Sequence, residues 1–303
     1  MKLHNAIQNY ISDQASFVSP ATTEWYAKRL KPLSPLANKQ LNRIKPDELR
    51  RAWVELANRK VRWSNHPSGR SPAKGGLSPY TLAGYIRCWR AFFQWCVERG
   101  YMERNPASSL KMPPLPDQPP KALSESDLQK LLAAAKDNPR DYAIVCVLAD
   151  SGCRVGGLVS LTLDALNLRR GRALVCEKGR AGGKQRTIYF KARTLQAIRD
   201  YLGVRPASDF DNVFLGKKKG PLTPSGVHSL LERLAICAKV KGRSNPHAFR
   251  HGFARGAVEN GVDLSQVSQL LGHRDVSVTV KFYARWADNE LKRAHARASW
   301  LPD

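Results

Sequence analysis

A proline-rich stretch constrains this chain more than any other feature. The segment KMPPLPDQPPK, residues 111–121, holds five prolines in eleven positions. Because proline fixes φ and lacks a backbone N–H, the segment can form neither a helix nor a central strand. It predicts a semi-extended linker over residues 113–122. The lengths on either side, 1–112 and 123–303, are each sufficient to bury a separate core, so we expect two domains.

The first 112 residues carry helical patterns. Helix starts are predicted at Ser19-Pro20, at Pro46-Asp47 and at Ser78-Pro79, the last opening a helix that runs to Gly100. Its aromatic residues recur at helical spacing, which favours a buried stripe over a base-stacking surface. The interval NRKVRWSNHPSGRSPAKGG, residues 58–76, is rich in Gly, Ser, Pro and basic residues and predicts a mobile basic loop. An all-α N-terminal domain is expected.

The C-terminal part mixes helices with short strands. Helices are predicted after the cap Ser124, over 141–149 and over 155–161, and further along at 191–202 and 224–240. Two segments rich in β-branched or aromatic residues, 173–176 and 187–190, flank a Gly/Lys-rich turn and predict a hairpin, to which 212–214 would add a third strand. The expected fold class is mainly α with a small antiparallel β-sheet in the C-terminal domain.

The charge of the chain points to a polyanion. Lys and Arg number 50 against 25 Asp and Glu, for a formal net charge of +25 and a pI near 10.2. Solubility alone needs only a modest net charge, so an excess spread over the whole length favours nucleic acid as the partner. The six cysteines are scattered with no C-x-x-C pair, which favours a reducing compartment. With no signal-peptide core and no span of sufficient length, we expect a cytoplasmic protein with no membrane partner.

The stretch from 247 to 283 concentrates the chemistry. His247 and Arg250 are three residues apart and therefore share one face of a helix that Asn245-Pro246 would open. A second helix, capped by Asp263, would end at Gly272 and deliver His273 to the next turn. Tyr283 lies ten residues further on a short helix whose expected inward-facing residues are Val276, Val280 and Phe282. Two histidines, an arginine and a tyrosine near helix ends predict a site for an anion.

The order H-x-x-R, L-L-G-H and a tyrosine ten residues later resembles the C-terminal signature of the tyrosine recombinases, the family of phage integrases and Xer-type enzymes. SGCRVGGLVSL resembles the T-G-x-R-x-x-E-L motif of this family, which makes Arg154 its first arginine. The helical block up to GYMERNPASSLKMP resembles the core-binding domain, so the resemblance covers about residues 5 to 295. It implies an all-α core-binding domain followed by a mixed α+β catalytic domain.

The resemblance also implies a reaction. Tyr283 would attack a DNA phosphorus and form a 3′-phosphotyrosyl link, so that rejoining needs no ATP, and no metal or other cofactor is expected. Arg154 and Arg250 would hold the phosphate, because guanidiniums bind its oxygens bidentately and never deprotonate. His247 would accept the tyrosine proton or hold a non-bridging oxygen, and His273 would donate a hydrogen bond.

The catalytic lysine of the family occupies the first position of a K-G pair. Lys178-Gly179 fits this pattern 24 residues after Arg154, so Lys178 is the expected general acid. Lys184, beyond the turn, is expected to neutralise a backbone phosphate instead. The further DNA contacts that we expect are Arg59, Lys60, Arg62, Arg70, Lys74, Arg87 and Arg90.

The family resemblance implies an assembly as well. The expected partner is double-stranded DNA with paired inverted half-sites, bound by a homotetramer that passes through a Holliday junction. Off DNA the chain would be a monomer or weak oligomer, in the cytoplasm at the nucleoid, and an accessory DNA-bending or directionality factor could take part. The alternatives are a non-catalytic DNA-binding relative and a type IB topoisomerase-like enzyme; the intact set of catalytic residues and the two-domain length favour the recombinase.

Two details leave alternatives open. Gly157 stands where the family has an acidic residue three positions after its first arginine, so either another acid substitutes or the site is looser. His247 and His251 are four residues apart, as zinc ligands on a helix can be, but no third ligand is well placed in the sequence. We therefore interpret His251 as a supporting or core histidine.

Overall fold

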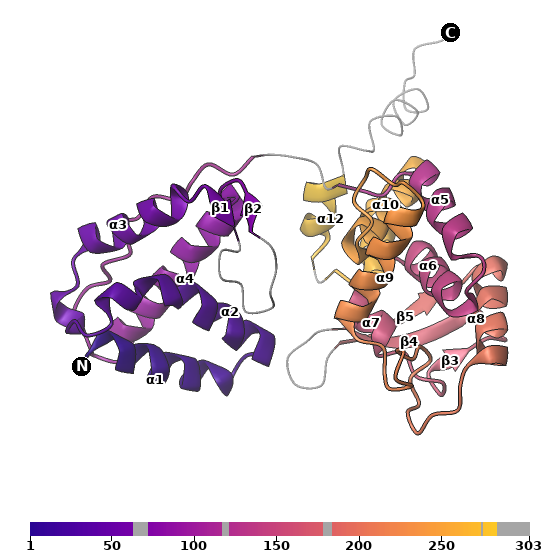
Figure 1. Cartoon of the computed structure of the whole chain (residues 1–303), viewed down its shortest axis with the longest axis horizontal. Helices are drawn as coiled ribbons and strands as arrows, with labels where there is room; N and C mark the ends of the chain where they lie inside the picture. The colour runs from indigo at the N-terminus through magenta and orange to yellow at the C-terminus, as the bar shows by residue number, and fades with distance from the viewer. Residues whose placement is uncertain (63–71, 117–120, 178–183, 274, 284–303) are drawn as a thin grey trace, which may run out of the picture. The chain divides into compact units, whose positions relative to one another are not determined.

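The computed structural model describes residues 1–62, 72–116, 121–177, 184–273 and 275–283. It divides into two compact units, Met1–Gln118 and Pro119–Asp303, and the division falls in the proline-rich stretch. Figure 1 shows helices throughout the first unit, and a three-stranded sheet flanked by helices in the second. Within the described residues, no helix is long and apolar enough to cross a membrane.

The first unit is built from helices that begin where the sequence predicts. Ser19 and Ser78 cap two of them through their side-chain oxygens, and three start with proline at the first turn. The longest helix packs its aromatic stripe into the centre, where Trp89, Phe92 and Phe93 are fully buried. The α-helices of the unit are α1 (Leu3–Ala15), α2 (Pro20–Leu30), α3 (Pro46–Ala57) and α4 (Pro79–Glu98), with 3-10 turns η1 (Lys31–Leu36) and η2 (Leu41–Arg43) between α2 and α3.

The basic loop, predicted over residues 58–76, has a short strand pair at its two ends that the sequence did not predict. Strands β1 (Val61–Arg62) and β2 (Ala73–Lys74) pair antiparallel there, so the N-terminal unit, expected to be all-α, also carries a two-residue strand pair. Gly75, with φ of +107°, and Gly76, where a Cβ would lie 3.0 Å from the carbonyl oxygen of Arg59, allow the two ends of the loop to meet. The pattern rich in Gly, Ser and Pro predicted the loop, but a two-residue pairing has no periodicity to detect.

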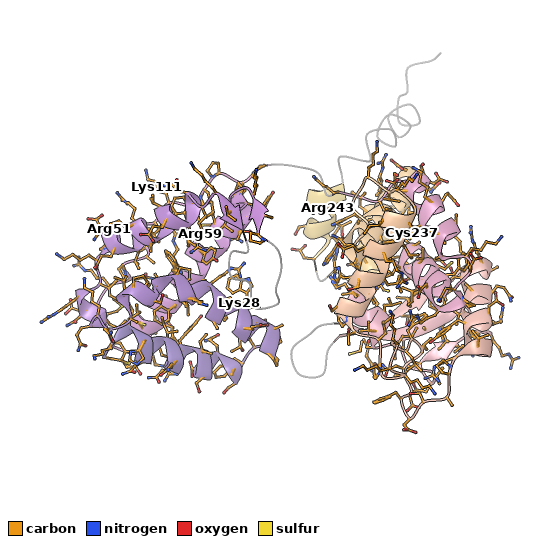
Figure 2. The ribbon with its side chains drawn as sticks, in the orientation of Figure 1. Lys28, Arg51, Arg59, Lys111, Cys237 and Arg243 are labelled. Atoms are coloured by element: carbon orange, nitrogen blue, oxygen red, sulfur yellow. The ribbon has the colours of Figure 1, made fainter. Side chains whose placement is uncertain are left out.

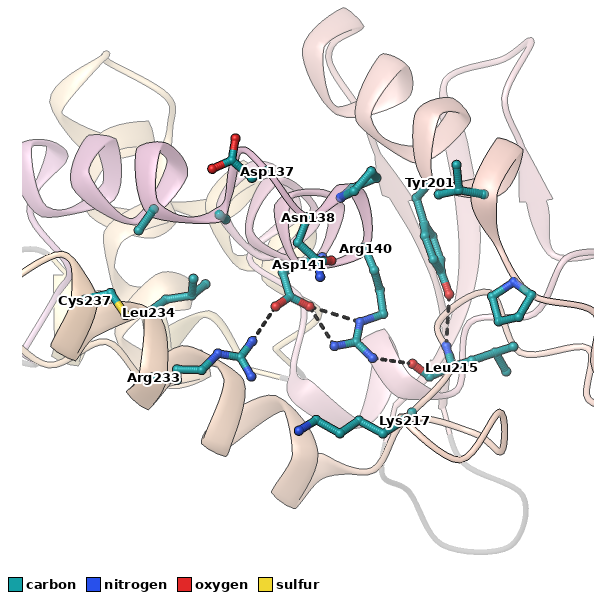
Figure 3. A pocket seen from close by; sticks show the side chains of 16 residues that line it. Asp137, Asn138, Arg140, Asp141, Tyr201, Leu215, Lys217, Arg233, Leu234 and Cys237 are labelled. Atoms are coloured by element: carbon teal, nitrogen blue, oxygen red, sulfur yellow. Dashed lines mark hydrogen bonds and ion pairs between the residues drawn. The ribbon is translucent and has the colours of Figure 1, made fainter.

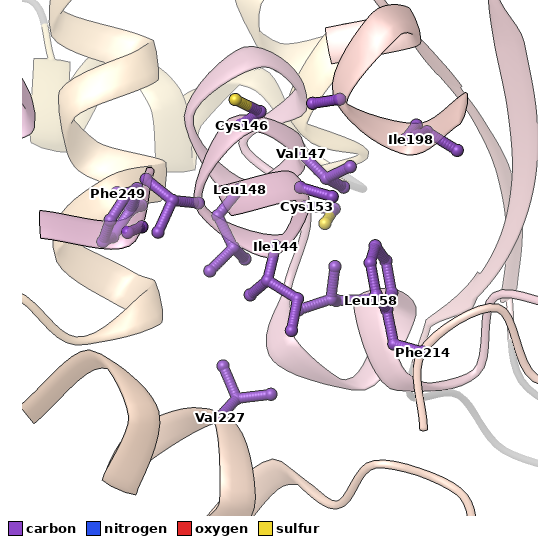
Figure 4. Close-up of a cluster of buried hydrophobic side chains, with 14 of the residues drawn as sticks. Ile144, Cys146, Val147, Leu148, Cys153, Leu158, Ile198, Phe214, Val227 and Phe249 are labelled. Atoms are coloured by element: carbon purple, nitrogen blue, oxygen red, sulfur yellow. The ribbon is translucent and has the colours of Figure 1, made fainter. Parts of the chain in front are cut away.

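The second unit surrounds one buried helix. Helix α6 (Pro139–Ser151) contributes Ile144, Val147 and Leu148 to the core, where they pack with residues from neighbouring elements (Figure 4). Its neighbours include α8 and α10 as well as α5. The helices of this unit are α5 (Glu125–Ala135), α6, α7 (Val155–Val159), α8 (Ala192–Val204), α9 (Pro224–Cys237), α10 (Pro246–Glu259), α11 (Leu264–Leu271) and α12 (Val276–Tyr283).

The sheet of this unit confirms the predicted hairpin and corrects its third strand. Strand β4 (Arg172–Glu177) pairs antiparallel with β5 (Lys184–Tyr189) over their whole length. The third strand is β3 (Leu166–Asn167), which pairs with the other edge of β4. Residues 212–214, expected in that place, make only an isolated bridge through Asn212. Val213 and Phe214 are buried by packing in the core, so their apolar run reflects burial and not membership of the sheet.

Candidate active site

Arg250 is the buried centre of the site. Helix α10, capped by the Asn245 side chain, carries it inward until only 3% of the residue is exposed. Its guanidinium donates to the carbonyl oxygens of Gly152, at 2.9 Å, and Leu271, at 2.6 Å. These carbonyls lie at the C-terminal ends of α6 and α11, where the helix dipole is negative. Arg250 therefore joins α10 to the C-terminal ends of two other helices, and it also carries a positive charge into the site.

Arg154 reaches the same place through a tight turn after α6. Gly152 has φ of +55°, and a Cβ there would lie 2.7 Å from the ring of Phe253, so both backbone and space require glycine. Two residues later Arg154 forms the N-cap of α7, with 37% of its side chain exposed. The Gly152 carbonyl bonded by Arg250 thus belongs to the turn that positions Arg154.

His247 lies one helical turn before Arg250. Its ring is exposed on one side, but partial desolvation lowers its pKa first, and the charges of Arg250, Arg154 and His228 lower it further. The imidazole is therefore neutral near pH 7 and able to accept a proton. The ring of His251 lies 6.5 Å from that of His247, and burial with the charges of His247 and Arg250 lowers the pKa of His251 to about 4.

His273 enters the site from the end of α11. Gly272 ends that helix with φ of +68°, as the sequence predicts, and a Cβ on it would meet the side chain of Arg186. Nδ1 of His273 lies 2.7 Å from the hydroxyl of Thr279 in α12. Burial, then the charges of Arg250 and Arg154, lower the pKa of His273 to about 4. Arg154 and Arg250 therefore both lie within electrostatic reach of both histidines, His247 and His273.

Helix α12 faces the site differently from its expectation. Val276 and Val280 are 43% and 44% exposed, whereas Thr279 is fully buried. The helix packs against α11 and α10. The reason is that α12 meets the His273 turn, a polar surface that a hydroxyl satisfies and a valine does not. Tyr283 is the last residue of α12, and its side chain lies outside the described residues.

A buried carboxylate, Glu177, completes the site and was absent from the sequence-based candidates. It ends β4, is 4% exposed, and accepts hydrogen bonds from the backbone N–H and the guanidinium of Arg154. Arg186 of β5 donates to the same carboxylate at 2.8 Å and to the carbonyl of Leu270 at the end of α11. Burial raises the pKa of Glu177, but the hydrogen bonds and charges of Arg186 and then Arg154 outweigh it, so the pKa is lowered. The strict alternation of β4, which buries Ala173, Val175 and Glu177, was the available signal.

The expected DNA-contact residues divide into three groups. Arg59, Lys60, Lys74 and Arg87 are exposed, and Figure 2 shows Arg59 at the surface of the first unit. Arg90 instead donates to the backbone carbonyls of residues 107, 108 and 110, so it ties the end of the unit to α4. Arg70 lies outside the described residues, as do the side chains of Arg62 and Lys184; the expected general acid, Lys178, lies outside them as well.

A cavity of about 690 Å³ lies at the N-terminal end of α6, and none of the candidate active-site residues lines it (Figure 3). Asp141, 2% exposed, points there toward Arg140 and Arg233, which bond its two oxygens at 2.8 and 2.5 Å. Its charge is thereby balanced within the protein. Among the described residues, no three His, Cys, Asp or Glu side chains group as a metal site would need, and the pair His247 and His251 gains no third ligand there.

The geometry suits a phosphate with growing negative charge. Arg154 at the start of α7 and Arg250 of α10 both lie within electrostatic reach of two neutral imidazoles, His247 of α10 and His273 after α11. Helix α12, whose last residue is Tyr283, packs against α10 and α11. Preorganised donors of this kind stabilise a pentacovalent phosphorus far better than water can. The arrangement needs a nucleophile and a proton donor to perform phosphoryl transfer.

Comparisons with known proteins give the family. Residues 121–290 match the model of the phage integrase family. The tyrosine recombinase XerC of Alcanivorax borkumensis is 34% identical over 213 residues, 67% of this chain and 68% of that protein. XerD of Pseudomonas aeruginosa is 32% identical over 231 residues, 73% of this chain and 76% of that one.

Solved structures show the same fold. The integrase of transposon Tn1549, in complex with a circular intermediate DNA, matches with a TM-score of 0.77 at 17% identity, over 97% of this chain and 99% of that one. The sequence matches and the shared fold agree with one another. The chain therefore belongs to the phage integrase family of tyrosine-type site-specific DNA recombinases.

Proposed function

We propose that the site holds one DNA phosphodiester between Arg154 and Arg250 while Tyr283 attacks its phosphorus. The observation that supports this most is that Arg154 and Arg250 both lower the pKa values of His247 and His273, which places both guanidiniums within electrostatic reach of both imidazoles. The tyrosine oxygen forms a bond to phosphorus as the bond to the 5′-oxygen breaks. The ester bond is exchanged and not lost, so rejoining the strand requires no ATP.

Each proton in this step has an assigned carrier. His247, neutral near pH 7 because its pKa is lowered, accepts the proton of the Tyr283 hydroxyl. The Thr279 hydroxyl, as donor to Nδ1 of His273, leaves the ring proton on Nε2, the tautomer that donates to a phosphate oxygen. Lys178 protonates the leaving 5′-oxygen; it follows Glu177 directly in the chain, at the end of β4.

The same proposal assigns a partner and an assembly. Residues 1–112 and 123–303 serve as the DNA-binding and catalytic domains, and exposed Arg59, Lys60, Lys74 and Arg87 contact the DNA backbone. The protein acts as a homotetramer on paired inverted half-sites, through a Holliday junction. Action on DNA places the protein at the nucleoid.

The nucleophile is tested with Tyr283→Phe. This variant keeps the ring and removes only the attacking oxygen, so it binds duplex DNA as the wild type does and forms no covalent adduct. The measurement is a denaturing gel of labelled DNA, with a gel shift under native conditions as the control for binding. An adduct formed by Tyr283→Phe contradicts the assignment, and an active wild-type protein excludes the alternative of a non-catalytic DNA-binding relative.

A further inference from the structure

Glu177 holds two arginines that belong to different parts of the site. Its Oε1 accepts from the backbone N–H of Arg154 at 3.2 Å and from Arg186 at 2.8 Å, and its Oε2 accepts from the Arg154 guanidinium. The carboxylate is 4% exposed and the Arg186 side chain 8% exposed. Without an anion between them, two guanidiniums this close would repel each other in surroundings that screen charge poorly.

The contacts of Arg186 extend this link to the opposite side of the site. Arg186 donates to the carbonyl of Leu270, and its side chain packs beside Gly272, where a Cβ would lie 2.5 Å from its Cδ. His273 follows Gly272 directly. A continuous path of contacts therefore runs from Arg154 through Glu177 and Arg186 to the turn that carries His273.

Gly157 leaves the space that Glu177 uses. This glycine is buried in α7, one turn after Arg154, and a Cβ built on it would lie 3.4 Å from Cγ of Glu177 and 3.3 Å from Cγ2 of Val175. A longer side chain at position 157 would therefore meet the side chains of Val175 and Glu177. The contacts show that an acid does buttress Arg154, and that it comes from strand β4 and not from α7.

We propose that Glu177 is a positioning residue for the recombination chemistry: it sets the place of the Arg154 guanidinium relative to the His273 turn by binding Arg154 and Arg186 at once. This inference rests on the proposed role of Arg154 at the phosphate. Arg154 keeps further N–H donors beyond the one that bonds Glu177, because a guanidinium has five. Glu177 itself touches no reacting atom and acts through the arginine.

Glu177→Gln tests this, because it keeps the shape of the side chain and removes its charge. We expect the rate of covalent adduct formation on a suicide half-site substrate to fall by roughly 10- to 100-fold, the usual effect of a misplaced catalytic group. Half-site affinity should not weaken, since the protein gains positive charge. Glu232→Gln, at an exposed position of α9, is the matched control for the charge change and should cleave as the wild type does.

A double-mutant cycle separates positioning from general support of the fold. If Glu177 acts through Arg154, Glu177→Gln lowers the rate in the wild type but has little further effect when Arg154 is alanine. An equal reduction in both backgrounds overturns the proposal, and so does a wild-type rate for Glu177→Gln. Should that variant not fold, Glu177→Asp keeps the charge but withdraws the carboxylate by one methylene; we expect a reduced rate, and a wild-type rate would refute the positioning role.

The cycle also distinguishes this inference from the proposed function. If Arg154→Ala cleaves normally, the assignment of Arg154 to the phosphate is wrong. If Arg154→Ala is strongly impaired and Tyr283 still carries the adduct, but Glu177→Gln is unaffected, only the positioning role of Glu177 is wrong.

Discussion

Replacing Thr279 with valine should slow DNA cleavage without weakening DNA binding. The hydroxyl of Thr279 is fully buried and lies 2.7 Å from Nδ1 of His273, and it connects the helix that ends at Tyr283 to the turn that carries His273. Valine has nearly the same shape, so the substitution removes the hydrogen bond and little else. Removing the bond costs about 0.5–1.5 kcal/mol, and the partial burial of Nδ1 raises this cost toward about 2 kcal/mol.

The hydrogen bond lost in this variant is one of the contacts that hold α12 against the turn carrying His273. A cost of about 1–2 kcal/mol corresponds to roughly a 5- to 30-fold change in an equilibrium, which sets the upper limit for the fall in cleavage rate through poorer placement of Tyr283. The substitution also removes the hydrogen bond that fixes the proposed tautomer of His273, which acts in the same direction. The groups proposed to contact DNA outside this site are unchanged, so half-site affinity should be that of the wild type.

The assay follows covalent adduct formation on a suicide half-site substrate under single-turnover conditions, with affinity measured by native gel shift. Thr279→Ser is the matched control because it keeps the hydroxyl and removes one methyl group, and it should retain most of the wild-type rate. A Thr279→Val protein that cleaves as fast as the wild type would refute the argument. So would a Thr279→Ser protein as slow as the valine variant, since the hydroxyl would then be irrelevant.

Four other changes test separate parts of the site. Arg250→Ala should lose roughly two to three orders of magnitude in cleavage rate. It should also lose about 2–6 kcal/mol of unfolding free energy, because two buried carbonyls lose their donor. A cleavage assay and urea unfolding measure the two effects, and a loss of only one would contradict a role in both catalysis and stability. Lys178→Ala should be impaired on ordinary DNA and rescued by sulfur in place of the bridging 5′-oxygen, whose thiolate leaves without protonation, whereas rescue of Lys184→Ala instead would reverse the assignment. Exchanging the basic residues of the 59–74 loop for glutamine should flatten the slope of log affinity against log salt by roughly 0.9 for each DNA phosphate that the loop no longer neutralises, and an unchanged slope would leave the loop a solvated surface. The folded-state pKa of His251 lies at about 4, below the ordinary 6.5, so its contribution to stability is present above pH 6.5 and is lost as pH falls toward 4; His251→Gln should reduce the fall in unfolding temperature between pH 7.5 and 5, and an unchanged fall would contradict this.

Local chemistry in the sequence was enough to predict most helices and the main constellation of the site. Helix starts depend on a capping side chain and a proline next to each other, as at Ser78 and Asn245, or on a capping side chain alone, as at Ser124. These contacts form wherever the helix later packs. The pair His247 and Arg250 was predictable in the same way, because residues three positions apart on a helix lie on the same face. Gly152 and Gly272 are predictable for the same reason, because a helix end with positive φ selects glycine.

Tertiary packing decided which face of each element meets which partner. The period of α12 allows its valines or Thr279 to face inward, and only the polar turn at His273 selects the threonine. Residues 212–214 have the apolar pattern of a strand, yet Val213 and Phe214 pack in the core, and it is β3 that pairs with β4. Arg90 follows the surface pattern of α4, but the carbonyls it bonds arrive from the loop after that helix.

Glu177 shows most clearly why the sequence alone does not give the contacts of a buried side chain. Glu177 lies 23 residues from Arg154 in the chain and reaches it because β4 packs beside α7. Sequence patterns record periodicity within one element, so they indicate that Glu177 faces inward. Which charges it meets there depends on contacts between distant segments: the packing of β4 beside α7, which carries Arg154, and the pairing of β4 with β5, which carries Arg186.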